Sequence, residues 1–242
     1  MRYYISDCHF YHRTLLKAMD KRPFSTIEEM NQAMIEAWNR KVRSNDEVVI
    51  LGDFSWGNAQ ETIDLLKALH GKKYLIRGNH DLYLKDKNFD LSLFEWVKDY
   101  AELHDNKRKV VLSHYPIVCY NGQYRLNEKG IPKTWMLYGH IHNTHDQQFI
   151  DAYCEMVSHQ HHQHIATQET VSIPIQMINC FCVRSDYTPL SLDEWIELEE
   201  KRKNNGSTPK PLTLSSSPQS IPRVHRPKKR TESKKRPKIG FV

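Results

Sequence analysis

One stretch of the sequence, residues 74–81, reads Tyr74-Leu75-Ile76-Arg77-Gly78-Asn79-His80-Asp81. It joins a short apolar run, typical of a buried strand, to a glycine and then to amide, imidazole and carboxylate side chains. In α/β folds the loops that follow strands carry much of the chemistry. The stretch therefore predicts a functional loop at the end of a strand.

Four other segments repeat this arrangement of an apolar run followed by polar side chains. The apolar runs are Tyr3–Ile5, Val48–Leu51, Val110–Leu112 and Trp135–Tyr138, and the polar segments after them are Asp7-Cys8-His9, Gly52-Asp53, His114 and Gly139-His140-Ile141-His142. We expect all five segments to open at the same end of a sheet. Their carboxylates, imidazoles and carboxamide suit Mn²⁺, Fe and Zn²⁺ better than thiolate-preferring metals.

A glycine stands directly before a candidate ligand in three of the segments, at Gly52, Gly78 and Gly139. We interpret each as the place where the strand turns sharply, because a residue without Cβ allows such a turn. One such segment alone would be weak evidence, since short motifs match by chance. Coincidence does not explain five segments in this order, each after its own strand.

The order Asp-x-His, Gly-Asp, Gly-Asn-His-Asp, His, Gly-His-x-His resembles the calcineurin-like metallophosphoesterase family over about residues 1–190. The resemblance implies a centre of two divalent metal ions, drawn from Mn, Fe, Zn or Ni, with manganese the expected metal. It assigns the first metal to Asp7, His9, Asp53 and His142, and the second to Asp53, Asn79, His114 and His140.

The same resemblance implies catalytic roles for His80, as general acid, and Asp81, as the carboxylate that orients it. The chemistry of the residues agrees. A bridging carboxylate such as Asp53 can hold two cations about 3.5–4 Å apart, which generate hydroxide near neutral pH for attack on phosphorus. His80 would then protonate the departing alkoxide. The alternative for Asp81 is a helix N-cap.

Substrate contacts are predicted at His12, Arg13 and Arg77, which lie close in sequence to the ligands. For His12 and Arg13 the alternative is the start of a surface helix. We expect a metal-dependent phosphoric ester hydrolase, and within it a phosphodiesterase or nucleotide hydrolase, because the short chain offers no second domain to form a groove for a protein substrate. The alternatives are a phosphomonoesterase or protein phosphatase, a catalytically silent scaffold with this fold, and a nucleic-acid-binding protein.

Hydrophobic spacing predicts amphipathic helices over Thr26–Val42 and Ala59–Leu69, and a capping box at Ser191–Glu194 opens a last helix. The run Ile173–Val183 is interpreted as a strand of a second sheet. Helices between the early strands, with further strands later, indicate an α/β fold of two stacked, mostly β sheets flanked by helices. The resembled family has a similar four-layer α-β-β-α sandwich.

Charge divides the chain into a domain over residues 1–200 and a tail over residues 201–242. The tail holds 13 Lys or Arg and one acidic residue, whereas residues 1–200 hold 22 basic and 28 acidic residues. With six prolines and few apolar residues, the tail is expected to be disordered. We expect it to attract nucleic acid or another polyanion, or to be dispensable. A nuclear localisation signal would have a similar composition.

Five cysteines do not form an even, secreted set, and the sequence has no signal segment or membrane-length apolar run. We therefore expect a soluble, cytoplasmic protein without a membrane partner. Cys180 and Cys182 would face one side of a strand as small buried residues. The histidines in residues 159–164 are interpreted as part of a polar loop rather than as a third metal site.

Overall fold

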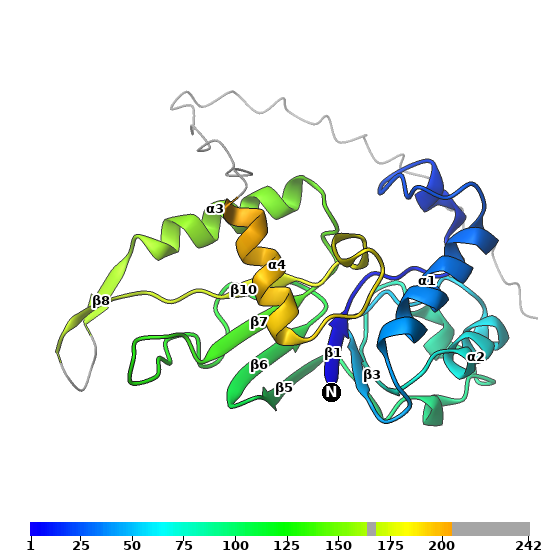
Figure 1. Cartoon of the computed structure of the whole chain (residues 1–242), viewed down its shortest axis with the longest axis horizontal. Helices are drawn as coiled ribbons and strands as arrows, with labels where there is room; N and C mark the ends of the chain where they lie inside the picture. Colours follow the sequence, from blue (N-terminus) through cyan, green and yellow to red (C-terminus); the bar gives the residue numbers. More distant parts are fainter. Residues whose placement is uncertain (164–167, 205–242) are drawn as a thin grey trace, which may run out of the picture. The chain divides into compact units, whose positions relative to one another are not determined.

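Two four-stranded sheets form the centre of the fold (Figure 1). The computed structural model describes residues 1–163 and 168–204. The first sheet has four parallel strands in the order β1 (Arg2–Ile5), β2 (Glu47–Ile50), β3 (Lys72–Ile76) and β4 (Trp96–Lys98). The second has the order β10 (Met177–Asn179), β7 (Thr134–Tyr138), β6 (Arg108–Ser113) and β5 (Tyr100–Asp105), with only β5 antiparallel to its neighbour.

Alternation along the strands separates the two faces of the first sheet. Ile5 and Ile50 pack in an apolar cluster with α1 (Ile27–Lys41) and α2 (Ala59–Ala68). The intervening residues point to the opposite face, where they pack against the second sheet; this cluster includes Tyr4, Val49, Leu51, Val110, Leu112 and Leu137. A helical layer therefore covers one face of the first sheet, and the second sheet covers the other.

The outer face of the second sheet carries its own apolar cluster. Val111, Met136 and Tyr138 point outward and pack with Val157 of α3 (His145–Ser158). The layers are thus helices, sheet, sheet and helix, and the predicted α-β-β-α sandwich is confirmed. Helix α4 (Leu192–Asn204) seals an edge between the sheets, because Leu192 lies in their shared cluster.

The three predicted helices are confirmed, and their first turns show why they begin where they do. The Thr26 hydroxyl accepts from the Glu29 amide at 3.1 Å and caps α1. Asn58 and Glu61 form a reciprocal capping box at α2. At α4 the Ser191 amide donates to the Glu194 carboxylate at 2.9 Å. Each cap satisfies amide groups that the helix itself leaves unpaired.

The prediction for Ile173–Val183 is correct only in part. The strand is confined to β10, and the chain then turns into the short 3-10 helix η4 (Cys182–Ser185). Cys180 and Cys182 are both fully buried, as expected, but they do not face one side. Cys180 packs between the sheets, whereas Cys182 packs in the cluster beneath α1, because the chain leaves the strand between them.

The histidine-rich segment is not simply a loop. It begins at the end of α3, a helix that the sequence did not predict, and continues into β8 (His161–Gln163), which pairs with β9 (Thr170–Ser172) in an antiparallel hairpin. His164 lies outside the described residues. Within the described ranges, the groups of three side chains that can hold a metal lie elsewhere, at the ends of the two central sheets.

Helix α4 extends to Asn204, so the first four residues of the predicted tail are part of the described fold. Arg202 donates to both carboxylate oxygens of Asp151, at 2.8 and 2.7 Å. The remaining tail, residues 205–242, lies outside the described residues. In the part of the chain that is described, no helix is long and apolar enough to cross a membrane.

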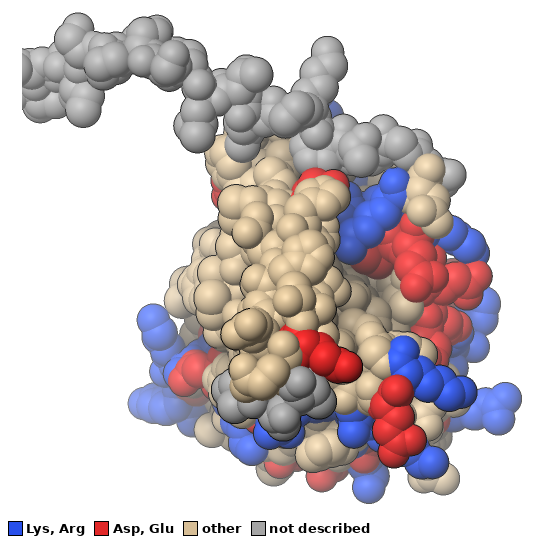
Figure 2. Space-filling model, turned by 90° about the vertical axis from the view of Figure 1, so that its left-hand side faces the viewer, with Lys and Arg blue, Asp and Glu red and all other residues tan. Residues whose placement is uncertain are grey.

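On the face of the described fold where β8 lies, uncharged side chains occupy the middle and charged ones its margins (Figure 2). Lys and Arg at these margins are mixed with Asp and Glu. This face therefore presents no continuous basic surface among the described residues.

Candidate metal centre

The ends of five strands bring the predicted metal ligands together. Three of the loops follow β1, β2 and β3 of the first sheet, and two follow β6 and β7 of the second, so the five loops are divided between the two stacked sheets and do not all belong to one. The ligand atoms form two groups, and within each group they lie within 4.8 Å of one another. The groups are Asp7, His9 and His142, and Asp53, His114 and His140.

The Asp53 carboxylate lies between the two groups. Its Oδ2 atom is 3.6 Å from Nε2 of His9 and 3.5 Å from Nε2 of His114. Its Oδ1 atom accepts the amide N–H of His80 at 2.8 Å, which fixes the plane of the carboxylate. One oxygen thus faces both groups, which is the placement that a bridging ligand requires.

Hydrogen bonds behind the imidazoles determine which ring nitrogens face the centre. Nδ1 of His142 lies 2.8 Å from a carboxylate oxygen of Asp20, and Nδ1 of His114 lies 2.8 Å from the Leu51 carbonyl. Both partners are acceptors, so each Nδ1 carries the proton and each neutral ring directs an Nε2 lone pair inward. This is the arrangement of a metal-binding histidine with an acceptor behind it.

The inward-facing nitrogens of His142 and His114 are acceptors when these imidazoles are neutral, and each lies close to another potential ligand atom. Nε2 of His142 is 3.2 Å from Nε2 of His9, and Nε2 of His114 is 3.1 Å from Oδ1 of Asn79. Converging lone pairs repel one another unless a cation or a proton lies between them. The donor set of imidazole nitrogens and carboxylate oxygens therefore fits divalent transition metals.

Burial and neighbouring charges shift the pKa values of three groups in the metal-free centre. Burial disfavours the charged form of His114, but the neighbouring Asp53 carboxylate outweighs it and raises the pKa of His114 to about 9. Burial would raise the pKa of Asp53, yet the hydrogen bond and charge of His114 lower it to about 2. Burial lowers the pKa of His9 to about 2, which keeps its imidazole neutral and able to bind a metal.

Five of the ligands adopt left-handed backbone conformations, which are unfavourable for residues other than glycine. Such a conformation costs on the order of 1–3 kcal/mol per residue and persists only where the surroundings impose it. Here the loops are bonded to one another: the His9 amide donates to the Asp53 carbonyl at 2.9 Å. The φ angles are 53° at Asp7, 49° at His9, 52° at Asp53, 70° at His140 and 48° at His142.

The three glycines serve two purposes, one of which we did not predict. Gly52 has a φ of 88° and makes the expected turn. Gly78 and Gly139 are required because the chain approaches a ligand closely. A Cβ at Gly78 would lie 2.2 Å from Oδ1 of Asp53, and one at Gly139 would lie 2.4 Å from Oδ2 of Asp7.

His80 lies half-buried beside the centre, with its ring centroid 5.7 Å from that of His9. Asp81 has a different role from both that we considered. Its carboxylate accepts the amides of Gly78 at 2.7 Å, Asp53 at 3.0 Å and Phe54 at 2.8 Å, so it joins two ligand loops. It precedes the 3-10 helix η2 (Leu82–Lys85), but its side chain makes no capping hydrogen bond there.

The predicted substrate contacts are only partly at the centre. His12 is close to it, because its ring centroid lies 5.2 Å from that of His9. Arg13 and Arg77 both end in exposed ion pairs. Arg13 contacts Glu28 at 3.1 Å, and Arg77 forms a two-pronged pair with Asp99 at 2.8 and 2.7 Å.

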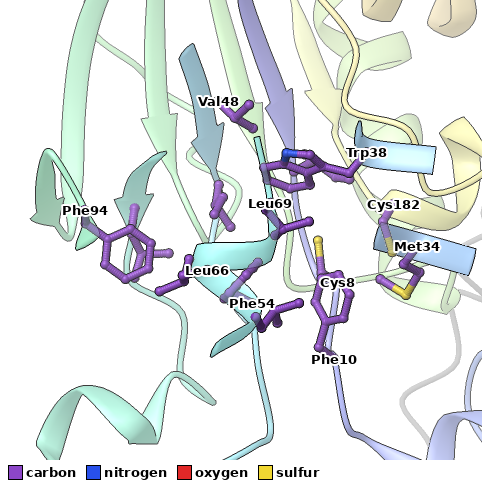
Figure 3. Close-up of a cluster of buried hydrophobic side chains, with 14 of the residues drawn as sticks. Cys8, Phe10, Met34, Trp38, Val48, Phe54, Leu66, Leu69, Phe94 and Cys182 are labelled. Atoms are coloured by element: carbon purple, nitrogen blue, oxygen red, sulfur yellow. The ribbon is translucent and has the colours of Figure 1, made fainter. Parts of the chain in front are cut away.

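Cys8 stands between two ligands in the sequence but points away from the metal-binding atoms. Figure 3 shows the Cys8 side chain within the apolar cluster to which Cys182 and Met34 also belong. The Cys8 side chain is fully buried there. Asp7 and His9 direct candidate ligand atoms to the centre, while the residue between them anchors the loop in the core.

A buried pair, Asp20 and Arg22, supports the centre and was not predicted. Asp20 holds His142, and Arg22 donates to the other Asp20 oxygen at 3.1 and 3.0 Å. Arg22 also donates to the carbonyls of Asp7 at 2.9 Å and Cys8 at 2.6 Å, while only 2% of its surface is exposed. Both residues lie in an irregular segment without a motif, so no pattern in the sequence indicated them.

Two exposed aromatic residues beside the centre were also missed. Trp56 stacks on His12, with centroids 3.9 Å apart and planes 12° apart. The Tyr115 hydroxyl lies 3.4 Å from Oδ1 of Asn79. The sequence feature that could have identified them is their position close to Asp53 and His114 in the chain.

Comparisons with known proteins agree with this geometry. The family model described as calcineurin-like phosphoesterase matches residues 3–204. The uncharacterized protein MJ1445 of Methanocaldococcus jannaschii is 32% identical over 205 residues, which cover 83% of this chain and 92% of that protein. The gene 66 protein of Mycobacterium phage D29 is 30% identical over 58% of this chain and 78% of its own length. The solved structure of AQ665 from Aquifex aeolicus, a protein of unknown function, has a TM-score of 0.52 at 22% identity, over 82% of this chain and 98% of that one.

Proposed function

The chain belongs to the calcineurin-like phosphoesterase family, and we propose that it is a metal-dependent hydrolase of phosphodiesters or nucleotides. The observation that carries the proposal is the placement of Asp53, whose Oδ2 atom faces His9 of one ligand group and His114 of the other at nearly equal distances. Such a carboxylate can be shared by two cations.

The proposed cofactor is a pair of divalent ions drawn from Mn, Fe, Zn or Ni, which accept nitrogen and oxygen donors, and manganese is the metal expected from the family. When bound, the ions would polarise the phosphate and activate water for attack on phosphorus. Asp7, His9, Asp53 and His142 would hold one ion, and Asp53, Asn79, His114 and His140 the other.

His80 is the proposed general acid. Its imidazole is half-buried beside the ligands, and the hydrogen bond from its amide to Asp53 fixes its backbone next to the centre. A positioned general acid contributes roughly 10²–10⁴-fold to the rate by protonating the leaving oxygen. The proton would matter most for an alkoxide leaving group and least for an acidic phenol.

The surroundings of the centre favour a substrate with a single negative charge on phosphate. Arg13 and Arg77, the candidate phosphate contacts, are each paired with a carboxylate. Burial lowers the pKa of His12, which makes this side chain neutral at pH 7. Because guanidinium groups are the usual partners of a phosphate dianion, their engagement elsewhere supports a phosphodiester over a phosphomonoester.

A catalytically silent scaffold is the alternative from another class, and it would be expected to lack ligands. The complete ligand set supports the enzyme.

For the tail we propose a secondary, electrostatic role. Residues 205–242 hold ten Lys or Arg and one acidic residue, enough to attract nucleic acid by releasing counterions.

The proposed function is tested by loading the full-length protein with Mn²⁺ and comparing bis(p-nitrophenyl) phosphate with p-nitrophenyl phosphate. We expect metal-dependent hydrolysis with a higher kcat/KM for the diester, and loss of both activities in Asp53→Asn. A preference for the monoester would overturn the diester assignment. No metal-dependent hydrolysis of either ester would overturn the enzymatic function.

A further inference from the structure

Asp81 was expected to orient His80, but its carboxylate binds backbone amides instead. Both oxygens of Asp81 accept backbone amides, and no hydrogen bond reaches the His80 imidazole within the part of the chain that the structure describes. The backbone of His80 is fixed, because its amide donates to Asp53. The side chain still needs another contact to hold its ring in one rotamer.

That contact is the indole of Trp56. The centroids of Trp56 and His80 are 4.5 Å apart, with ring planes tilted by 40°. His12 stacks on the indole at 3.9 Å and 12°, so two imidazoles pack against one indole. His12 in turn lies 5.2 Å from His9, which connects this ring cluster to a metal ligand.

The loop that carries Trp56 is itself well anchored. The Trp56 amide donates to the Phe10 carbonyl at 2.8 Å. The preceding residue, Ser55, is fully enclosed, and its hydroxyl lies 2.8 Å from that of Thr62 on α2 and accepts the Gly57 amide at 3.1 Å. Trp56 is nevertheless 43% exposed. Packing of the core therefore does not explain its position, whereas its contacts with His12 and His80 do.

We infer that Trp56 is a positioning residue that holds the His80 imidazole in the orientation from which it protonates the leaving group. The inference rests on the proposed function and adds to it a residue outside the ligand set. Loss of the indole would let the His80 ring rotate away and admit water on that side. The defect should consequently appear in proton transfer and leave the metal ions bound.

Two diesters with a common nucleoside separate proton transfer from binding. The p-nitrophenyl ester of thymidine 5′-monophosphate needs little protonation of its leaving group, whereas thymidylyl thymidine releases an alkoxide. For Trp56→Ala we expect kcat on the dinucleotide to fall about tenfold, a part of what a positioned general acid contributes. On the nitrophenyl ester kcat should stay within about twofold, and metal content should be unchanged. Trp56→Phe retains a ring and should keep most of the wild-type kcat on the dinucleotide.

Two controls make the result specific. In a His80→Ala background, Trp56→Ala should cause no additional loss of kcat on the dinucleotide. The effects of substitutions at residues that act as one unit are not additive. Phe149→Ala removes another exposed ring, 47% exposed on α3, and should show no dependence on the leaving group. A readout independent of turnover is the NMR signal of the His80 ring in the metal-free protein, which should lose the ring-current shift caused by Trp56.

Equal losses on both esters, or a further loss in the His80→Ala background, would overturn the inference. An increase in KM without a change in kcat would also overturn it, and would assign Trp56 to substrate binding instead. Wild-type protein that hydrolyses neither ester would instead refute the proposed function, and the inference with it. Activity of the wild type on the nitrophenyl ester thus distinguishes the two failures.

Discussion

Replacing Asp20 with asparagine should weaken metal binding although Asp20 is not itself a ligand. Its Oδ1 atom accepts Nδ1–H of His142 at 2.8 Å, and its Oδ2 atom binds Arg22. Burial would raise the pKa of Asp20, but the hydrogen bond and charge of His142 outweigh it and lower the pKa, so the carboxylate is ionised at neutral pH. Asp20→Asn removes that charge and leaves the shape of the side chain almost unchanged.

The expected loss follows from the position of Asp20 directly behind a ligand. Removing such a partner typically lowers metal affinity 10–100-fold, and a factor of ten corresponds to about 1.4 kcal/mol. The variant also leaves Arg22, which is 2% exposed, without its carboxylate. Breaking a buried ion pair costs about 3–5 kcal/mol of folding stability, so the stability of the metal-free protein should fall as well.

The assay is titration of the metal-free protein with Mn²⁺ in competition with a chelator, with denaturant unfolding of the same samples. Asp64→Asn is a matched control, because Asp64 is an exposed carboxylate on α2 that accepts one hydrogen bond, from Gln60 at 2.9 Å. This control should retain both affinity and stability. Folded Asp20→Asn protein that binds Mn²⁺ within about twofold of the wild type would refute the supporting role of Asp20.

Four further outcomes are expected. Because the pKa of His114 is raised to about 9 in the metal-free chain, its proton competes with metal, so Mn²⁺ affinity measured by titration should rise with pH from about 6 to 9 and then level off. Gly78→Ala places a Cβ 2.2 Å from Oδ1 of Asp53, so elemental analysis should find less bound metal and unfolding assays a loss of stability. His80→Ala should keep its metal content but lose at least about 100-fold in kcat for alkoxide leaving groups, and much less for nitrophenolate. Deleting residues 205–242 should preserve hydrolysis of a small ester while making the salt dependence of nucleic-acid binding shallower, and identical salt slopes would exclude an electrostatic role for the tail.

The parts of the fold that the sequence predicted are those encoded locally. The strands before the ligand loops are short apolar runs, and α1, α2 and α4 begin at capping residues, so neighbouring positions specify them. The order of the ligand segments also follows from local motifs. By contrast, β4, β8 and β9 are only three residues long, too short to show an apolar pattern, and the sequence analysis did not reveal them.

The supporting side chains of the centre could not be predicted for a similar reason. Asp20 and Arg22 act through the folded path of an irregular loop, which brings them to His142 and to the carbonyls of the first ligand segment. Asp81 stands next to His80 in sequence, but its carboxylate turns inward to the backbone of another loop. Proximity along the chain therefore suggested the wrong partner for that carboxylate.

Whether two metal ions share Asp53 is decided by the metal content of Asp53→Asn. Wild-type and variant proteins would be dialysed against Mn²⁺, separated from free metal and analysed for metal per chain, with folding checked by circular dichroism. We expect about two equivalents for the wild type and well under one for the folded variant, because the shared oxygen serves both ions. Two equivalents retained by Asp53→Asn, or a single equivalent in the wild type, would contradict it.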